Sequence, residues 1–182
     1  MSTNKDLAAQ IKQKITTWLT EENLFEKSIP PQQGLQYGFL FRFPPKAPAI
    51  YSIAVQQNIL DSVIVARGVQ VSPEHQNIIK NWQPKIRNAF LADFLINLHS
   101  HPIEFQIMYQ NENLQGFKVV KRLFMESLTK NQFWKSVVSL QNASQSAILL
   151  IQKSTDTFAM RPHMPSGTRN LKRPEDSTGM FG

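Results

Sequence analysis

Apolar side chains recur at intervals of three and four residues near the start of the chain. This spacing predicts an amphipathic helix from Asn4 to about Glu22. Its apolar stripe consists of Leu7, Ile11, Ile15, Trp18 and Leu19. A helix that is apolar on one side needs a sheet or a partner to cover that side.

Strict alternation of side chains then predicts three strands. The first is the aromatic stretch Tyr37–Phe43, the second runs from Ile50 to Gln57, and the third lies within Val63–Val71. Short connections between consecutive strands favour an antiparallel meander. In the first strand the residues between the aromatic ones are also mainly apolar. This composition is typical of a central strand or of a strand that meets a partner.

A second helix begins at a clear signal. Ser72 can cap it, Pro73 suits the first helical position, and Glu74 places an acid in the first turn. Helical spacing continues from there to His99. Pro84 lies inside this run, and it predicts a kink or a division into two helices because proline removes a backbone hydrogen bond.

Two further strands follow the second helix. Alternating side chains predict a fourth strand at Phe105–Tyr109 and a fifth from Phe117 to about Met125. Residues 111–116 between them are rich in turn formers and predict a loop.

The last predicted element is a helix followed by a tail. Thr129 and Gln132 have the spacing of a capping box, and the helix that they start can run to about Ser154. Residues 155–182 contain prolines and glycines but few large apolar side chains, so we predict a flexible tail.

These elements predict an α+β fold in the order α-β-β-β-α-β-β-α. Helices would pack on one antiparallel five-stranded sheet. Residues 1–154 would form one domain, and residues 155–182 the flexible tail. The chain has 182 residues, of which 41% are hydrophobic, so a core of this size needs neither a metal nor a disulfide for stability.

Composition narrows the functional classes. The chain has no cysteine, which excludes disulfides and thiolate zinc sites. No apolar run approaches the roughly 18–20 residues that span a membrane. The N-terminal residues lack the apolar core of a secretory signal, so we predict a cytoplasmic protein. The net charge of +7 is a mild basic excess that attracts nucleic acids or acidic partners.

The sequence shows no recognisable catalytic or cofactor motif. It has no phosphate-binding loop and no nucleophile elbow. His99 and His101 form an H-x-H pair, but no third ligand has a suitable spacing, so we predict no metal site and no cofactor. An enzyme whose site is assembled only in space stays open as an alternative.

Basic residues in the predicted fifth strand suggest a second alternative. Lys118, Lys121 and Arg122 could contact the phosphates of a nucleic acid. Alternation places Lys118 and Arg122 on one face of the strand and Lys121 on the other, so the three do not form one strip.

Three segments carry a family resemblance. They are VQVSPEHQNIIKNW at the entry to the second helix, FLADFLINLHSHPIEFQI at its exit, and FMESLTKNQFWKSV at the start of the last helix. With them the chain resembles an uncharacterised archaeal family that has the YbjN-like, type III secretion chaperone-like fold. The resemblance covers roughly residues 6–153 and implies a compact module without a cofactor, often dimeric. Secretion chaperones hold an extended partner segment against their sheet and first helix.

From these observations we predict a non-catalytic protein-binding module: an adaptor, a chaperone-like protein or a subunit of a larger complex. The partner would be another protein or a second copy of the chain. The predicted contact surface lies on the aromatic first strand and its neighbour, at Phe39, Phe41, Tyr51 and Ile53. A nucleic-acid-associated module is the alternative.

Overall fold

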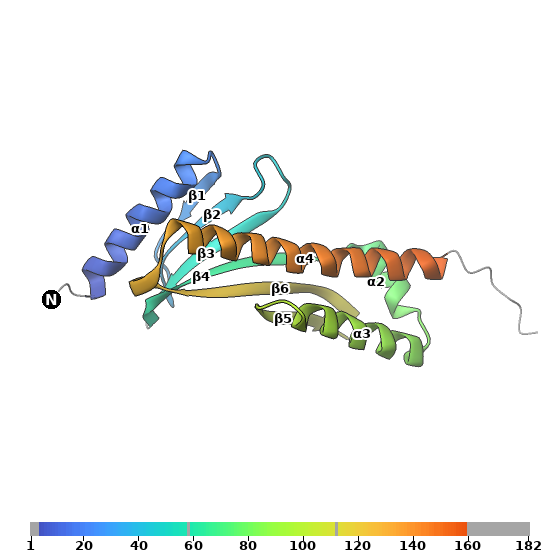
Figure 1. Cartoon of the computed structure of the whole chain (residues 1–182). Coiled ribbons are helices and arrows are strands. Elements are labelled where there is room, and N and C mark those ends of the chain that lie inside the picture. Colours follow the sequence, from blue (N-terminus) through green and yellow to red (C-terminus); the bar gives the residue numbers. More distant parts are fainter. Residues whose placement is uncertain (1–3, 58, 112, 160–182) are drawn as a thin grey trace, which may run out of the picture.

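The described residues form one antiparallel sheet with helices against it (Figure 1). The computed structural model describes residues 4–57, 59–111 and 113–159. Within these ranges the strand order is β1-β2-β3-β4-β6-β5. The strands are β1 (Phe25–Ile29), β2 (Leu35–Arg42), β3 (Ile50–Gln56), β4 (Ile59–Gln70), β5 (Glu104–Gln110) and β6 (Asn113–Phe124). The helices are α1 (Asn4–Glu21), α2 (Pro73–Lys80), α3 (Pro84–His99) and α4 (Lys130–Ala159), with a 3-10 turn η1 (Met125–Ser127) before α4.

The helices contact one face of the sheet, which we call the covered face. From α1, the carbonyl of Ala8 accepts a hydrogen bond of 3.1 Å from the Tyr37 hydroxyl. From α3, the ring of Phe94 packs edge-on against Phe117, with their centroids 5.4 Å apart. Figure 1 shows α4 running across this face, and its Phe133 lies 6.1 Å from Phe41 between ring centroids.

The hydrophobic core fills the space between the covered face and these helices. Successive strands contribute the same alternate positions because their side chains alternate between the two faces. Phe41 is paired with Tyr51, and Ile53 with Val65. The apolar stripe predicted for α1 is buried in this core at Ile11, Ile15 and Leu19. This burial is the cover that an amphipathic helix requires.

The local signals at the helix starts are confirmed. The Ser72 hydroxyl accepts a hydrogen bond of 3.3 Å from the backbone N–H of His75 at the start of α2. Before α4, the Thr129 N–H donates to Gln132 Oε1 at 3.1 Å, and the Gln132 N–H donates to Thr129 Oγ1 at 3.2 Å. This reciprocal pair is the predicted capping box.

The long second helix is divided in two. α2 ends at Lys80 and α3 begins at Pro84. Proline occupies the first position of α3, where a missing N–H costs nothing. The division is therefore one of the two outcomes that Pro84 predicts.

The prediction of five strands is wrong, because the described residues include a sixth at the edge of the sheet. This strand, β1, pairs with β2 and has four exposed residues followed by one that is half-buried. Its sequence FEKSI is apolar only at its two ends. A short edge strand buries little, so its alternation pattern is weak.

Several predicted boundaries also differ. β4 begins at Ile59, four residues before the predicted start at Val63. β6 begins at Asn113, so most of the predicted loop before Phe117 is strand. α4 continues past Ser154 to Ala159, and the buried Thr155 donates its hydroxyl back to the Ile151 carbonyl at 2.9 Å. The predicted tail therefore begins too early. The rest of it, residues 160–182, lies outside the described residues.

Candidate functional site

The second face of the sheet, which we call the open face, has no helix or strand of the described ranges packed on it. Cross-strand register places a row of directly opposed residues across the sheet. The row consists of Lys27, Leu40, Ser52, Ala66, Val120 and Glu104. Small and apolar residues therefore form its middle and charged residues its two ends.

Large apolar side chains are exposed on the open face. Ile50 on β3 is 44% exposed, Met108 on β5 41% and Phe124 on β6 59%. The register places these three residues at separate points around the margin of the face. Single exposed apolar residues are ordinary, and it is the small and apolar side chains between them that would make this face an interaction surface. Between them, Ala54 and Ile64 are half-buried by their neighbours.

The charges around the open face are mainly basic. Lys27 and Lys118 are exposed, and Arg42 is half-buried. The Arg42 Nε atom lies 2.5 Å from the Glu26 carboxylate, so this guanidinium is already paired. Arg122 is half-buried and donates a hydrogen bond of 3.3 Å to the Ser62 hydroxyl. The charged side chains around the apolar middle of the open face therefore have a net positive charge.

The residues predicted as the contact surface lie on the other face. Phe39, Phe41, Tyr51 and Ile53 are at most 1% exposed, because α1 and α4 cover them. Phe41 stacks on Tyr51 with ring centroids 5.2 Å apart. These four side chains are core in the folded chain, which does not present them to a partner.

The three basic residues predicted for a nucleic acid divide between the faces as expected from alternation. Lys118 and Arg122 share the open face, where Lys118 is opposite Gly68 and Arg122 opposite Ile64. Lys121 is opposite the buried Val65, and its ammonium group donates to the Pro102 carbonyl. The open face therefore brings together two of the three.

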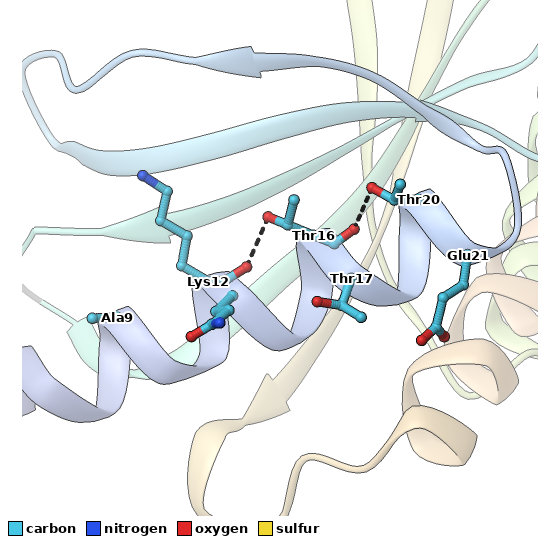
Figure 2. A pocket seen from close by; sticks show the side chains of 7 residues that line it. Ala9, Lys12, Thr16, Thr17, Thr20 and Glu21 are labelled. Carbon is cyan, nitrogen blue, oxygen red and sulfur yellow. Dashed lines mark hydrogen bonds between the residues drawn. The ribbon is translucent and has the colours of Figure 1, made fainter.

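A hollow of about 570 Å³ lies along the outer side of α1 (Figure 2). Figure 2 shows that the hydroxyls of Thr16 and Thr20 point back to the helix, where they donate to the carbonyls of Lys12 and Thr16. Their hydrogen bonds are 2.9 Å and 2.8 Å long. Hydroxyls engaged in this way do not converge on a ligand, so this hollow is not a catalytic constellation.

A second groove, also about 570 Å³, lies between α3 and α4. Ile86 and Phe90 from α3 and Leu150 from α4 contribute its apolar lining, and Lys85, Asp93 and Lys153 also line it. The groove is a seam between two packed helices.

The histidine pair has structural contacts. The ring of His99 packs edge-on against Phe105 with centroids 4.8 Å apart, and His101 Nε2 lies 3.0 Å from the Ser146 hydroxyl. In the described part of the chain, no three acidic, histidine or cysteine side chains gather where they could hold a metal ion. None of its helices is long and apolar enough to cross a membrane.

Fold and surface together define the class: a two-layer α+β protein whose sheet is covered by helices on one face and open on the other. The chain belongs to the DUF2299 family, described as an uncharacterized conserved protein, whose model matches residues 11–151. The matched range therefore includes all of the described sheet and most of α4. A search of curated proteins returns no match.

Two solved structures are similar to this chain. An uncharacterized protein from Methanothermobacter thermautotrophicus is 22% identical, with a TM-score of 0.73 over 78% of this chain and 96% of that one. This likeness shows a shared fold with an archaeal protein. YbjN from E. coli is 14% identical, with a TM-score of 0.44 over 80% of this chain and 92% of that one, too loose a match to support an inference.

Sequence reasoning missed the open face as a candidate surface. Alternation identifies the two sets of side chains on each strand, but both sets are partly apolar in β2 and β4. A usable signal was the small residues Gly38, Ser52, Ala54 and Ala66, which all fall in one set. The helices cover the set that contains the large aromatic residues.

Proposed function

We propose that this protein is a non-catalytic binding module that holds an acidic protein partner on the open face of its sheet. The observation that carries the proposal is the arrangement of this face, with exposed Ile50, Met108 and Phe124 around a middle of small side chains. An adaptor or complex subunit needs such a surface, whereas an enzyme needs a concave site with converging polar groups.

The area of the open face supports this proposal. With strands ~4.8 Å apart and a rise of ~3.3 Å per residue, the six described strands present a surface of roughly 800 Å². A standard protein interface buries about 800 Å² on each partner. The open face is therefore large enough for one stable contact.

Charge determines the kind of partner that we propose. Lys27, Lys118 and Arg122 lie around the apolar middle, and Glu26 is already paired with Arg42. A partner with acidic residues around an apolar centre complements this pattern, and complementary charge contributes mostly to specificity and association rate.

A nucleic-acid partner is the second candidate, because Lys118 and Arg122 share the open face. Base recognition on a sheet uses aromatic rings on which successive bases stack. The middle of this face instead has Ser52, Ala54 and Ala66, which offer no stacking platform. For this reason a protein partner fits the surface better.

Matched variants test the proposal. The full-length chain, a double variant Ile50→Glu with Phe124→Glu, and a control Leu149→Glu would each capture partners from nuclease-treated native lysate, with quantitative mass spectrometry as the readout. Leu149 is 54% exposed on α4, away from the open face. All three proteins should have similar melting temperatures, because every substituted side chain is exposed.

We expect a stoichiometric acidic protein that the wild type and the Leu149 variant retain and the double variant loses. Retention of the same proteins by all three would overturn the open-face assignment. A parallel capture without nuclease tests the second candidate. Bound nucleic acid whose binding falls steeply as salt rises would favour a nucleic-acid partner over a protein partner.

A further inference from the structure

The two edges of the sheet differ in how well they are protected against pairing with another strand. A free edge presents unpaired backbone N–H and C=O groups, and natural proteins block it with charge, proline, bulges or short length. β1 forms one edge and β5 the other. This asymmetry is independent of the open face.

β1 is protected. It has five residues, a register shift between Phe25 and Lys27, and Lys27 at its centre. Pro30 and Pro31 follow it directly. Each of these features discourages a further strand.

β5 is not protected in this way. Its seven residues, EFQIMYQ, contain no proline, lysine or arginine, and their one charge is Glu104 at the start. The pairing of β5 with β6 also has a register shift, at Met108 and Tyr109, but the extra residue there is Gln115 on β6, so β5 itself has no bulge. Six strands pair in the described ranges, and none of them pairs with the outer edge of β5. Most of β5 is exposed, including Met108 at 41% and Tyr109 at 48%.

α3 adds an apolar flank above this edge. Phe94 faces the sheet, and Asn97 turns toward α4, where its side chain accepts a hydrogen bond of 3.0 Å from Ser146. Leu95 is about 100° further round the helix than Phe94, on the side away from Asn97. Leu95 is 37% exposed and therefore lies on the flank that faces past β5.

We propose that β5 pairs antiparallel with β5 of a second copy of this chain, giving a dimer with one continuous sheet. The two-fold axis would pass between Ile107 and Ile107 of the second copy, which would be directly opposite each other. This register pairs all seven residues of the strand: Phe105 with Tyr109, Gln106 with Met108, and Glu104 with Gln110. It is self-complementary, as a two-fold interface requires.

Three features of the strand favour a second copy over an unrelated peptide. The covered-face pairs join aromatic with aromatic and Ile107 with itself, which are favourable cross-strand combinations. The carboxylate of Glu104 is opposite an amide, so no like charges meet. The axis is perpendicular to the sheet, so both copies of α3 lie on the same side with their Leu95 flanks facing each other.

This dimer goes beyond the proposed partner surface and does not depend on it. The two open faces would become parts of one larger face with two equivalent binding sites. Sedimentation of the full-length protein tests the oligomeric state, and we expect a species of twice the 20.9 kDa monomer mass. A protein that stays monomeric at all concentrations up to about 100 µM would overturn the proposal. Its dimer dissociation constant would then exceed about 100 µM, too weak for a stable dimer.

Two charge variants test the register. Gln106→Glu combined with Met108→Glu places like charges opposite each other across the proposed axis, whereas Gln106→Glu combined with Met108→Lys places opposite charges there. Both native side chains are exposed, so both variants should fold. We expect roughly tenfold weaker dimerisation for the first than for the second, because two symmetry-related pairs change sign. Equal dissociation constants would overturn this register.

A cysteine substitution gives an independent readout. The chain has no cysteine, so Ile107→Cys introduces one thiol, which would meet its own copy at the axis and form an intermolecular disulfide under mild oxidation. Gln106→Cys is the matched control, since residue 106 and its copy would be diagonal neighbours. Equal cross-linking of the two variants would contradict the pairing. A dimer whose open-face variants retain the same partners as the wild type would instead count only against the proposed function.

Discussion

The Arg67 guanidinium donates a hydrogen bond of 2.6 Å to the Ser144 hydroxyl, and this contact joins the C-terminal half of β4 to the middle of α4. Arg67 also donates to the Tyr51 hydroxyl at 3.3 Å and lies 5.5 Å from the centre of the Tyr51 ring. Ser144 is fully buried. A cation is therefore held on the covered face by hydroxyl groups and an aromatic ring.

Removal of this hydroxyl should destabilise the protein. We expect Ser144→Ala to lower the free energy of unfolding by about 1–3 kcal/mol, because Arg67 keeps its charge but loses its shortest hydrogen bond. Urea unfolding measures the change. Ser139→Ala on the same helix, at a half-buried serine, is the control and should cost less. Equal midpoints for the two variants would show that the contact contributes nothing.

The aromatic strand should behave as core and the open face as surface. Phe41→Ala should cost about 3–5 kcal/mol of folding free energy, because it leaves a cavity under α4. Ile50→Ala, at a position 44% exposed on the next strand, should cost less than about 1 kcal/mol. Thermal unfolding compares the two. A stable Phe41→Ala variant that lost a partner would restore the contact surface predicted from the sequence.

Stability should fall at alkaline pH. Burial raises the pKa of Tyr37 well above its ordinary value of 10.0, and burial also raises the pKa of Tyr51, against the opposing effect of Arg67. The unfolded chain therefore releases these protons at lower pH than the folded one. The stabilisation is fully present below pH 10 and is lost as pH rises above it.

Urea midpoints on either side of pH 10 check this prediction. The Tyr37→Phe variant cannot ionise at this position, so its stability should decline less steeply above pH 10 than that of the wild type. At neutral pH the same variant should be slightly less stable, because the hydrogen bond to the Ala8 carbonyl is gone. Identical alkaline slopes would argue against a buried Tyr37 phenol.

Two glycines, Gly38 on β2 and Gly68 on β4, should respond differently to alanine. A Cβ atom at Gly38 would lie 2.8 Å from the Ile53 carbonyl oxygen and 3.3 Å from Ile29 Cδ1, so Gly38→Ala should cost about 1–3 kcal/mol. A Cβ atom at Gly68 would meet nothing within 4 Å. Gly68→Ala should be neutral or slightly stabilising, because alanine reduces the entropy of the unfolded chain. Chemical denaturation of both variants measures the two changes in free energy of unfolding. Equal changes would show that the steric clash at Gly38 contributes nothing.

Elements with strong local signals were predicted correctly. The cap at Ser72 and the capping box at Thr129 depend on residues three positions apart, and both are confirmed. The break at Pro84 follows from the missing N–H of one residue. The edge strand β1 was missed because an edge strand buries too little to impose an alternating pattern.

The contact surface predicted from the sequence and the candidate surface of the structure lie on opposite faces of the sheet. The sequence predicted that β2 is apolar on both faces and that Lys118 and Arg122 share a face, and the structure agrees with both. It placed the contact surface on Phe39 and Tyr51, which the helices bury. Large aromatic side chains stabilise a core and an interface equally well, so composition alone does not distinguish the two.

The sequence by itself determined where the helices and five of the six described strands form, because hydrogen-bonded caps, proline positions and side-chain periodicity act over a few residues. Only the tertiary structure decided which face of the sheet is covered and which edge is free. Those choices depend on contacts such as Phe41 with Phe133 and Arg67 with Ser144, which join residues 92 and 77 positions apart. Such contacts form only when the helices fold back across the sheet.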